Sequence, residues 1–393
     1  MSYLNYTAEL FGLKGFNVEK IEETKEYFIV DITKEKMNHT CPSCRNITNK
    51  VHDYRNQKIR HTVLSGKMVI LNYRKRRYIC PSCNKRFYEN ASFIAKGYQI
   101  SKQLISLILR KFNQITTYTD VAREYHLSPT SVIRYYDNLS FSKSTLPQVI
   151  GLDEFKGNLG GEKFQTIITN PKKHNIIGFV KSRKRDDLDE AMLRYKNRSN
   201  VKLVVMDMST IYKGLAHRMF PNAEIVADKY HVIRLSSFAL ENVRKKEQNR
   251  FSKEHRKRIK TQKRLLKRSK ENLHEEEMCR LANLFEQMPR LGKSYYLHEK
   301  FRKIFKAKDL KEAEKLISNW ELEASVSKID EFKDCIKALE NWRHEIMNIF
   351  RYEITNGYTE GCNNKSKVLK RVSYGLMNYE RFVKRRMQLW QNI

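Results

Sequence analysis

Two near-identical cysteine motifs constrain the fold more than any other feature of the chain. Cys41-Pro42-Ser43-Cys44 and Cys80-Pro81-Ser82-Cys83 are separated by thirty-five residues. Each motif can form a tight turn whose thiolates converge, and two such turns supply the four sulfur ligands that structural zinc prefers. A thioredoxin-like redox motif is the alternative for one Cys-x-x-Cys, but two matched copies favour a zinc ribbon. We therefore expect a structural Zn²⁺ held by Cys41, Cys44, Cys80 and Cys83.

This zinc is expected to stabilise the fold rather than to catalyse a reaction. Four thiolates leave no open position for water, and the metal can fold a module too small to stabilise itself. Residues 67–73 (KMVILNY) predict a strand of a hairpin that joins the two turns. Because four cysteines already fill the site, we expect His52 and His61 to be ordinary surface residues.

The chain is strongly basic, with 77 Lys and Arg against 44 Asp and Glu and a formal net charge of +33. Such a field attracts polyanions, above all nucleic acid, and makes their binding salt-dependent. A solvated or membrane-attracted surface is the alternative, but no other lipid signal accompanies the charge. The sequence contains neither an apolar run of about eighteen residues, which a membrane-spanning helix needs, nor a signal-peptide pattern. The odd number of cysteines, seven, argues against a disulfide framework and for a reducing compartment. The sequence predicts a cytoplasmic protein.

The composition changes along the 393 residues, which are too many for one compact core. The expected fold class is a multidomain α+β protein with an α/β core. The predicted regions are an N-terminal region with the zinc ribbon (1–95), a helix-turn-helix (98–142), the first part of the core (146–240), a basic helical insertion (241–350) and a C-terminal helix of the core (351–393).

A basic segment between the cysteine motifs is a candidate DNA contact. Residues 73–78 (YRKRRY) place cations between aromatic residues, a composition that suits phosphate contact and base stacking. A charged edge strand is the alternative. The candidate residues are Arg74, Arg76 and Arg77.

Residues 101–138 predict three short helices separated by tight turns. Ser128 is placed to cap the third helix, and Pro129 stands at its first position, where a missing N–H costs nothing. Val132, Ile133 and Tyr136 are expected to point inward, so that the opposite face can enter a major groove. A three-helix bundle that binds nothing is the alternative. The expected DNA-binding residues are Thr130, Ser131, Arg134 and Tyr135.

The next region alternates predicted strands and helices and carries acidic residues at strand ends. A β-run ends in Asp153 and Glu154, residues 164–169 and 176–180 predict two further strands, and residues 186–195 predict a helix. The buried strand 201–206 delivers Asp207, and strand 223–227 ends at Asp228. This order is that of a ribonuclease-H-like sheet. Because strand alternation turns Glu154 away from Asp153, Glu154 is expected to be secondary.

Phosphodiester cleavage needs an activated nucleophile and a neutralised leaving oxygen. Two Mg²⁺ (or Mn²⁺) ions about 3.5–4 Å apart supply both, and hard oxygen ligands hold them. Asp153 would bridge the metals, with Asp207 and a third acid completing the shells. Glu360 is the candidate for that acid, because a helix beginning at Asn356-Gly357 places it on one face with three DNA-binding candidates. Glu353 is the competing acid, but it lies before Asn356-Gly357 and therefore outside this helix. On spacing alone, a surface salt-bridge helix fits equally well. The three candidates on this face are Asn364, Lys367 and Arg371.

Four segments together resemble one bacterial family. They are residues 150–155 (IGLDEF), 205–209 (VMDMS), 227–232 (ADKYHV) and 359–365 (TEGCNNK). They are similar to the DDE transposases of the ISL3 insertion-sequence group, and the resemblance covers nearly the whole chain. It implies an RNase-H-like core, Mg²⁺-dependent cutting at terminal inverted repeats, insertion into target DNA, and catalytic acids at Asp153, Asp207 and Glu360.

The pair Asp228-x-x-His231 resembles a further element of related transposases. A histidine beside the metals could shuttle a proton or position the scissile phosphate. A satisfied histidine at a helix start is the alternative.

The 152 residues between Asp207 and Glu360 exceed what a minimal core needs. Residues 241–270 hold fourteen Lys and Arg against three Glu. A run of like charge is often only a solvated or disordered segment, but a chain that must hold two DNA segments favours a DNA-gripping helical insertion. Trp320 and Trp342 are expected to pack its core, with base stacking as the minor alternative.

The predicted function is that of a transposase that binds double-stranded DNA, both transposon ends and target, as a homo-oligomer, expected to be a dimer on DNA. One alternative is a non-enzymatic zinc-ribbon and helix-turn-helix regulator, which would not need the acids. The other is a nuclease or resolvase on the same fold, which would cleave strands but never join them.

Overall fold

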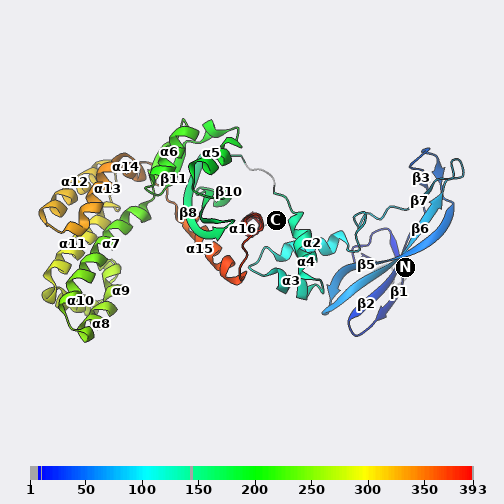
Figure 1. The fold of residues 1–393 in the computed structure, drawn as a ribbon, viewed down its shortest axis with the longest axis horizontal. Coiled ribbons are helices and arrows are strands. Elements are labelled where there is room, and N and C mark those ends of the chain that lie inside the picture. Colours follow the sequence, from blue (N-terminus) through cyan, green and yellow to red (C-terminus); the bar gives the residue numbers. More distant parts are fainter. Residues whose placement is uncertain (1–7, 10, 142–144, 392–393) are drawn as a thin grey trace. The chain divides into compact units, whose positions relative to one another are not determined.

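The computed structural model describes residues 8–9, 11–141 and 145–391 and divides the chain into two compact units (Figure 1). The first unit contains the chain up to residue 141 with 371–374 and the segment from 384 onward; the second contains 142–370 and 375–383. Helices and sheets occur in both, which confirms a multidomain α+β protein. Within the described part of the chain, none of the helices combines the length and apolar character that crossing a bilayer requires.

The first unit is built on a five-stranded sheet. Its strands follow the order β1-β2-β6-β5, and β7 also pairs with β6. The long β5–β6 hairpin turns at Ser65-Gly66, where both residues have positive φ, as a two-residue hairpin turn requires. The strand predicted over residues 67–73 is the first half of β6. The bounds are β1 Phe16–Glu23, β2 Tyr27–Lys34, β5 Val51–Leu64, β6 Lys67–Ile79 and β7 Arg86–Tyr88.

The basic segment of residues 73–78 lies on β6, in the interior of this sheet, so the alternative of an edge strand is wrong. Tyr73 and Tyr78 are fully buried and are therefore not available for base stacking. Arg76 is turned inward, where it donates to the carbonyl oxygen of Lys34. Only part of the predicted cationic surface is therefore exposed.

His61 corrects a second expectation, because it is buried and not a surface residue. Its Nδ1 lies 3.0 Å from Ser101 Oγ and its Nε2 lies 2.7 Å from the carbonyl oxygen of Phe11. These contacts join β5 to the start of the first helix that follows the sheet. Burial lowers the pKa of His61, which keeps the imidazole neutral.

Three short helices follow the sheet: α2 (Lys102–Lys111), α3 (Tyr118–Glu124) and α4 (Pro129–Asp137). As predicted, Ser128 caps α4 by accepting a hydrogen bond from the backbone N–H of Ser131, and Pro129 occupies the first position. Tyr135 is not exposed as expected: it is buried, with its ring centroid 6.0 Å from that of Tyr98.

The last helix, α16 (Tyr379–Gln391), ends in the first unit. Arg385 donates to the carbonyl oxygens of Phe112 and Thr116, and its guanidinium lies 4.4 Å from the centre of the Phe112 ring. Gln388 donates to Asn113 Oδ1. The C-terminal residues of the chain therefore complete the small helical cluster formed by α2 to α4.

The second unit is built on a sheet of order β10-β9-β8-β11-β12. Strands β8, β9 and β10 are antiparallel neighbours, whereas β8, β11 and β12 run parallel. Every strand and the first helix predicted for this region are present. The bounds are β8 Val149–Leu159, β9 Glu162–Asn170, β10 Asn175–Val180, α5 Arg185–Leu193, β11 Leu203–Met206, α6 Thr210–Met219 and β12 Glu224–Ala227.

Helix α15 (Gly357–Val372) packs directly onto β8. Asn356 donates to the carbonyl oxygen of Leu152, and Thr359 Oγ1 lies 2.6 Å from Thr169 Oγ1 on β9. Gly151 permits this contact, because a Cβ there would lie 2.6 Å from the side chains of Asn356 and Thr169. The absence of a side chain at residue 151 therefore sets how closely α15 approaches the sheet.

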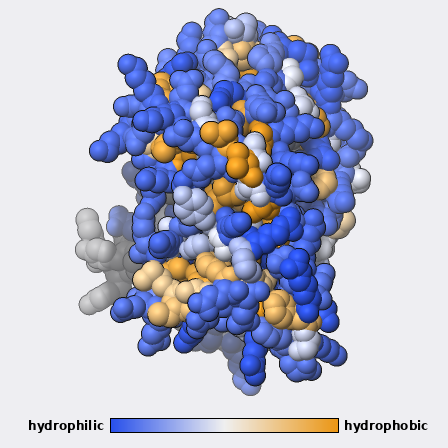
Figure 2. Space-filling view, turned by 90° about the vertical axis from the view of Figure 1, so that its left-hand side faces the viewer, coloured by the Kyte–Doolittle hydropathy of each residue, from blue (hydrophilic) through white to orange (hydrophobic). Residues whose placement is uncertain are grey.

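A helical insertion lies between β12 and α15. The face seen in Figure 2 is mainly hydrophilic and carries two apolar patches. The core of the insertion contains Trp320 and Trp342, both buried as predicted, and Trp320 Nε1 donates to the carbonyl oxygen of Leu297. The helices are α7 Lys229–Glu247, α8 Lys253–Thr261, α9 Lys263–Lys267, α10 Glu275–Gln287, α11 Pro289–Ile304, α12 Leu310–Val326, α13 Lys333–Asn341 and α14 Arg343–Tyr352.

Candidate functional site

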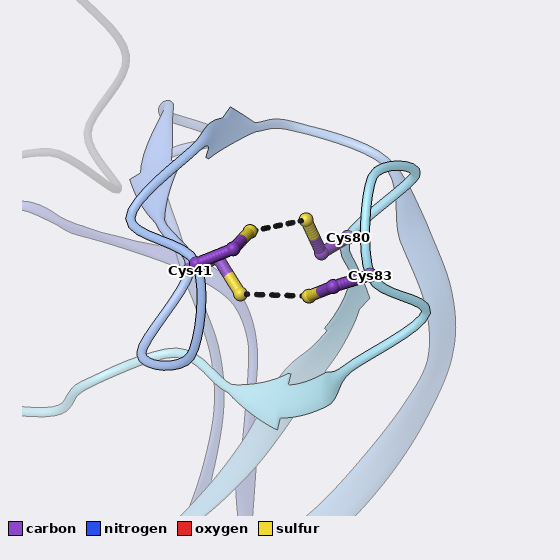
Figure 3. Close-up of side chains that lie close together, drawn as sticks. Cys41, Cys80 and Cys83 are labelled. Carbon is purple, nitrogen blue, oxygen red and sulfur yellow. Dashed lines mark hydrogen bonds between the residues drawn. The ribbon is translucent and has the colours of Figure 1, made fainter.

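The four predicted cysteines lie together at one end of the first sheet (Figure 3). Cys41 Sγ lies 3.5 Å from Cys83 Sγ, and Cys44 Sγ lies 3.5 Å from Cys80 Sγ. All four sulfur atoms lie within 4.8 Å of one another. One turn follows β3 (His39–Thr40) and precedes β4 (Ile47–Thr48), and the other connects β6 to β7.

The two cysteine turns have the same backbone. Cys41 N–H donates to Asn46 and Arg45 N–H donates to Cys41; Cys80 and Asn84 repeat both bonds in the second turn. Arg45 and Asn84 both have positive φ, at 63° and 53°. Backbone N–H groups, first that of Cys44, lower the pKa of Cys41, which favours the thiolate that binds a metal. Four converging sulfurs on two matched turns fit a tetrahedral Zn²⁺.

The acidic residues of the second unit are brought together by strand register. Leu152 of β8 pairs with Met206 of β11, and Met206 pairs with Ala227 of β12. The residues that follow these three on parallel neighbouring strands are Asp153, Asp207 and Asp228. One row of the sheet therefore carries three consecutive aspartates, although β8 continues six residues beyond Asp153 and does not end there as predicted.

Glu360 reaches the same place from α15. It lies in the first turn of that helix, and its backbone N–H donates to the carbonyl oxygen of Asn356. A cavity of about 890 Å³ is lined by Asp153, Asp207 and Glu360, with Glu154 and His231. The structure therefore brings the three predicted acids to one cavity. Glu154, which was expected to be secondary, also lines it and is paired with Arg183 at 2.9 Å.

Asp153 is the most buried of the three acids, with 7% of its surface exposed. Its Oδ1 accepts from the backbone N–H of Glu154, and its Oδ2 accepts from Asn363 Nδ2 at 2.7 Å. Burial, with the negative charge of Asp207, raises the pKa of Asp153 to about 7. Two carboxylates so placed repel each other, and a cation between them would relieve that repulsion.

His231 stands between two carboxylates on the first turn of α7, which Asp228 caps. Its Nδ1 lies 2.8 Å from Asp228 Oδ2 and 2.8 Å from Asp207 Oδ1. Burial opposes the imidazolium, but the interactions with Asp207 and Asp228 outweigh burial and raise the pKa of His231 to about 10. A protonated His231 therefore balances part of the negative charge of the cluster.

The donor set of this cluster fits a hard divalent cation. Asp207, Asp228 and His231 each offer a ligand atom, and these atoms lie within 4.8 Å of one another. Asp207 Oδ1 is buried and contacts His231 Nδ1 at 2.8 Å. Buried carboxylates need positive charge beside them, and a hard divalent cation is a further source of that charge. The acids are therefore the part of the site suited to hold metal.

The rotation of α15 brings Asn363, rather than the predicted Asn364, into the cavity. Asn363 is buried and bonded to Asp153, whereas Asn364 is exposed and accepts from Lys367 Nζ at 3.4 Å. Lys367 lines the same cavity as Glu360; Arg371 is exposed and belongs to the first unit. Asn363 was missed because spacings of three and four residues both fit one helix face.

Part of the cavity lining comes from the helical insertion. Lys245 of α7, Lys263 and Lys267 of α9, and Arg302 of α11 line the cavity. Lys263 is paired with Glu241 at 2.8 Å, and the pKa of Glu241 is lowered to about 2 because Arg244 and Lys263 outweigh the opposing effect of burial. A cavity lined by both acids and cations suits a phosphodiester beside bound metal.

In the first unit, the candidates on α4 differ in exposure. Thr130 and Arg134 are exposed and Ser131 is half-buried. Ser131, Arg134 and the buried Tyr135 line a second cavity of about 520 Å³ that also includes Arg60 of β5. On β6, Arg74 is exposed and its guanidinium lies 4.2 Å from the centre of the Tyr54 ring, while Arg77 contacts Asp53 at 3.4 Å.

An acid-lined cavity with a cationic wall, in a basic chain that also carries a four-cysteine cluster, is the arrangement of an enzyme that processes nucleic acid. Residues 150–386 match the model of the DDE transposase family ISL3, described as "Transposase". Residues 38–83 match the "zinc-finger of transposase IS204/IS1001/IS1096/IS1165". The chain is also 23% identical over 390 residues, 95% of each protein, to the "Transposase for insertion sequence element IS1001" of Bordetella parapertussis.

The chain therefore belongs to the ISL3 family of DDE transposases and is an enzyme, a DNA transposase. The predicted family resemblance is confirmed. So is the zinc ribbon, because a family match and a cluster of four sulfur atoms agree on the same cysteines. The non-enzymatic regulator is thereby excluded as the function of the chain.

Proposed function

We propose that this transposase binds the terminal inverted repeats of its own insertion sequence, cuts the DNA there, and joins the ends to target DNA with Mg²⁺. The catalytic core would be the five-stranded sheet of the second unit with α15, an RNase-H-like arrangement. One observation carries the proposal: Asp153, Asp207 and Glu360, from two strands and a distant helix, line a single cavity.

Asp153, Asp207 and Glu360 would hold two divalent cations. When bound, such a pair supplies the charge that activates water or a 3′-hydroxyl and neutralises the leaving oxygen. Asn363 holds Asp153 in place, because its amide donates to Oδ2 and leaves the remaining lone pairs of the carboxylate for metal. Lys367 lines the cavity where the phosphate of the cut strand would lie.

His231 and Asp228 would assist the cleavage reaction by a role other than binding the metal ions. Asp228 accepts the Nδ1–H of His231 and so fixes the orientation of the imidazole. A protonated His231 next to Asp207 can donate a proton to the leaving 3′-oxygen or hold the scissile phosphate by charge. This role is the reason to test His231 separately from the three acids.

DNA recognition is proposed for the first unit. The helices α2, α3 and α4 would form a helix-turn-helix in which the exposed Thr130 and Arg134 and the half-buried Ser131 reach a major groove. Tyr135 is a buried residue of α4, so it is not proposed to contact DNA. Arg74 and Arg77 would contact phosphates, as would Asn364 and Arg371 along α15. Because two ends must be held together, the active form would be a dimer on double-stranded DNA.

The test uses purified full-length protein, labelled duplex carrying the element's ends, and Mg²⁺. Wild type is expected to cut at the end of the element and to join it to target DNA. Asp153→Asn, Asp207→Asn and Glu360→Gln should each abolish both steps while leaving end binding intact. Strand transfer that persists in any of these variants contradicts the site assignment. Cutting without joining by wild type would instead indicate a nuclease or resolvase.

A further inference from the structure

The cavity between the acids and the insertion contains aromatic side chains that the chemistry described so far does not use. Tyr230 and Phe238 of α7 both line it and are 52% and 51% exposed. Single exposed apolar residues are common on protein surfaces. Here two exposed aromatic residues lie in one cationic cavity, on the helix that begins at the catalytic cluster. Such a pair indicates a binding surface rather than chance exposure.

These side chains form one stripe along α7. Tyr230, Arg234 and Phe238 follow at intervals of four residues, so they lie on one face of the helix. All three line the cavity. The Arg234 guanidinium lies 4.9 Å from the centre of the Phe238 ring, which places a positive charge beside the exposed aromatic surface.

This stripe has the two components of a surface that binds unpaired bases. Aromatic rings stack on the bases, and nearby cations contact the phosphates. Here Lys245 and Lys267 supply further cations in the same cavity. A volume of about 890 Å³ is in the range of sites for small molecules, so a single nucleotide fits beside the stripe.

We propose that Phe238 is a stacking platform for a base that leaves the duplex next to the cleaved bond. This inference rests on the proposed cutting of element ends and deepens it, by assigning the DNA a distorted form at the active site. Extruding a base costs unpairing energy, and stacking on Phe238 offsets that cost. The displaced base also lets the scissile phosphate approach the acids more closely than a regular duplex would allow.

The geometry limits where the extruded base lies. Phe238 follows His231 by seven residues of helix, or about 10 Å at 1.5 Å per residue. This distance corresponds to about three nucleotide steps at 3.4 Å each. The extruded base is therefore expected within about four nucleotides of the cleaved phosphodiester.

The experiment compares cleavage of an element-end duplex with cleavage of duplexes that carry one abasic nucleotide at each of these positions in turn. Phe238→Ala is expected to cut the unmodified duplex about 10- to 100-fold more slowly than wild type. An abasic nucleotide at the extruded position should restore most of that loss, because no base then needs a platform. Phe238→Trp should cut the unmodified duplex at close to the wild-type rate.

Leu322→Ala is the matched control, because Leu322 is a 67% exposed apolar residue of α12 outside the cavity. It should cut like wild type on every duplex. Wild-type cutting of the unmodified duplex tests the proposed function by itself. If wild type binds but does not cut, binding affinities for the same duplexes decide the inference instead, with Phe238→Ala expected to regain affinity on one abasic duplex. Unchanged behaviour of Phe238→Ala, or a defect that no abasic position relieves, overturns the proposal.

Discussion

Asp153 and Asp207 place two carboxylates side by side in a largely buried row, where each raises the free energy of the other's charged form. Asp153→Asn removes one of these charges but keeps the shape of the side chain and one oxygen that can accept a hydrogen bond. We therefore expect this variant to unfold at a temperature several degrees above wild type in EDTA at pH 7.5. Thermal unfolding followed by circular dichroism measures this.

The same variant should respond differently to metal. A ligand that binds only the folded state raises the unfolding temperature, so millimolar Mn²⁺ is expected to stabilise wild type and to have little effect on Asp153→Asn. An equal rise in both proteins would show that Asp153 is not a metal ligand.

Asn363 offers a second test at single-residue resolution. Its amide orients Asp153, and removing such a partner of a metal ligand commonly costs about 10- to 100-fold in activity or metal affinity. Asn363→Ala is expected to lose this much cleavage while binding element-end DNA normally. Asn341→Ala, at an exposed asparagine at the end of α13, serves as the control and should cut at the wild-type rate. Normal cutting by Asn363→Ala would remove Asn363 from the site.

These residues also show how far the sequence can predict a site. Asp153, Asp207 and Asp228 follow apolar runs, so their strand positions are recoverable from hydrophobic pattern alone. The choice between Asn363 and Asn364 is not, because it depends on a rotation of α15 that the contacts of Asn356 and Thr359 with the sheet determine. Periodicity identifies a helix face only to within about one residue position.

At the scale of elements, the zinc ribbon should depend on its four cysteines and on no other. Cys44→Ser is expected to lower the zinc content from about one ion per chain to nearly none, because three thiolates hold zinc much less tightly than four. Cys279→Ser, at an exposed cysteine of α10, should keep the zinc. Metal analysis of the purified proteins measures both, and zinc retained by Cys44→Ser would contradict the four-sulfur site.

The helical insertion contains a buried histidine that makes its stability depend on pH. His298 of α11 lies 2.8 Å from Ser236 Oγ of α7 through its Nδ1, and burial, with the charge of Arg302, lowers its pKa to about 3. Unfolding exposes the imidazole and returns its pKa to about 6.5. The unfolded state therefore takes up a proton first, and stability falls as the pH drops from about 6.5 towards 3, by up to about 1.4 kcal/mol per pH unit.

His298→Gln should flatten this part of the pH dependence, whereas His217→Gln, at an exposed histidine of α6, should not. Urea unfolding followed by tryptophan fluorescence reports mainly on the insertion, because two of the three tryptophans, Trp320 and Trp342, are buried there. The same slope in wild type and His298→Gln would assign the pH dependence to other groups.

Features that depend on the local sequence pattern were predicted correctly, whereas the burial of side chains that depends on tertiary packing was not. The cap at Ser128 and the hairpin strand at 67–73 follow from local residue preferences. The inward turn of Arg76 and the burial of His61 and Tyr135 do not, because each depends on residues far away in the chain. Charged and polar side chains at such positions look exposed until their partners are known.

At the scale of the whole molecule, the net charge of +33 has to be divided between surfaces that bind DNA and surfaces that only keep the chain in solution. Composition cannot make this division, since it counts Lys267 and Lys311 alike. The cavity does make it: Lys245 and Lys267 line the cavity that the acids also line, whereas Lys311 and Lys315 on α12 lie outside it.

The salt dependence of binding should therefore separate the two sets. Each phosphate that a cation neutralises contributes about 0.9 to the slope of log K against log salt concentration. Lys245→Gln with Lys267→Gln is expected to weaken binding of an element-end duplex and to lower that slope by about 2. Lys311→Gln with Lys315→Gln removes the same charge from the exposed face of α12 and should leave the slope nearly unchanged. Fluorescence anisotropy between 50 and 200 mM KCl measures both slopes, a range over which counterion release is well resolved. Equal slopes for the two double variants would mean that the cavity wall attracts DNA only through the overall charge of the chain.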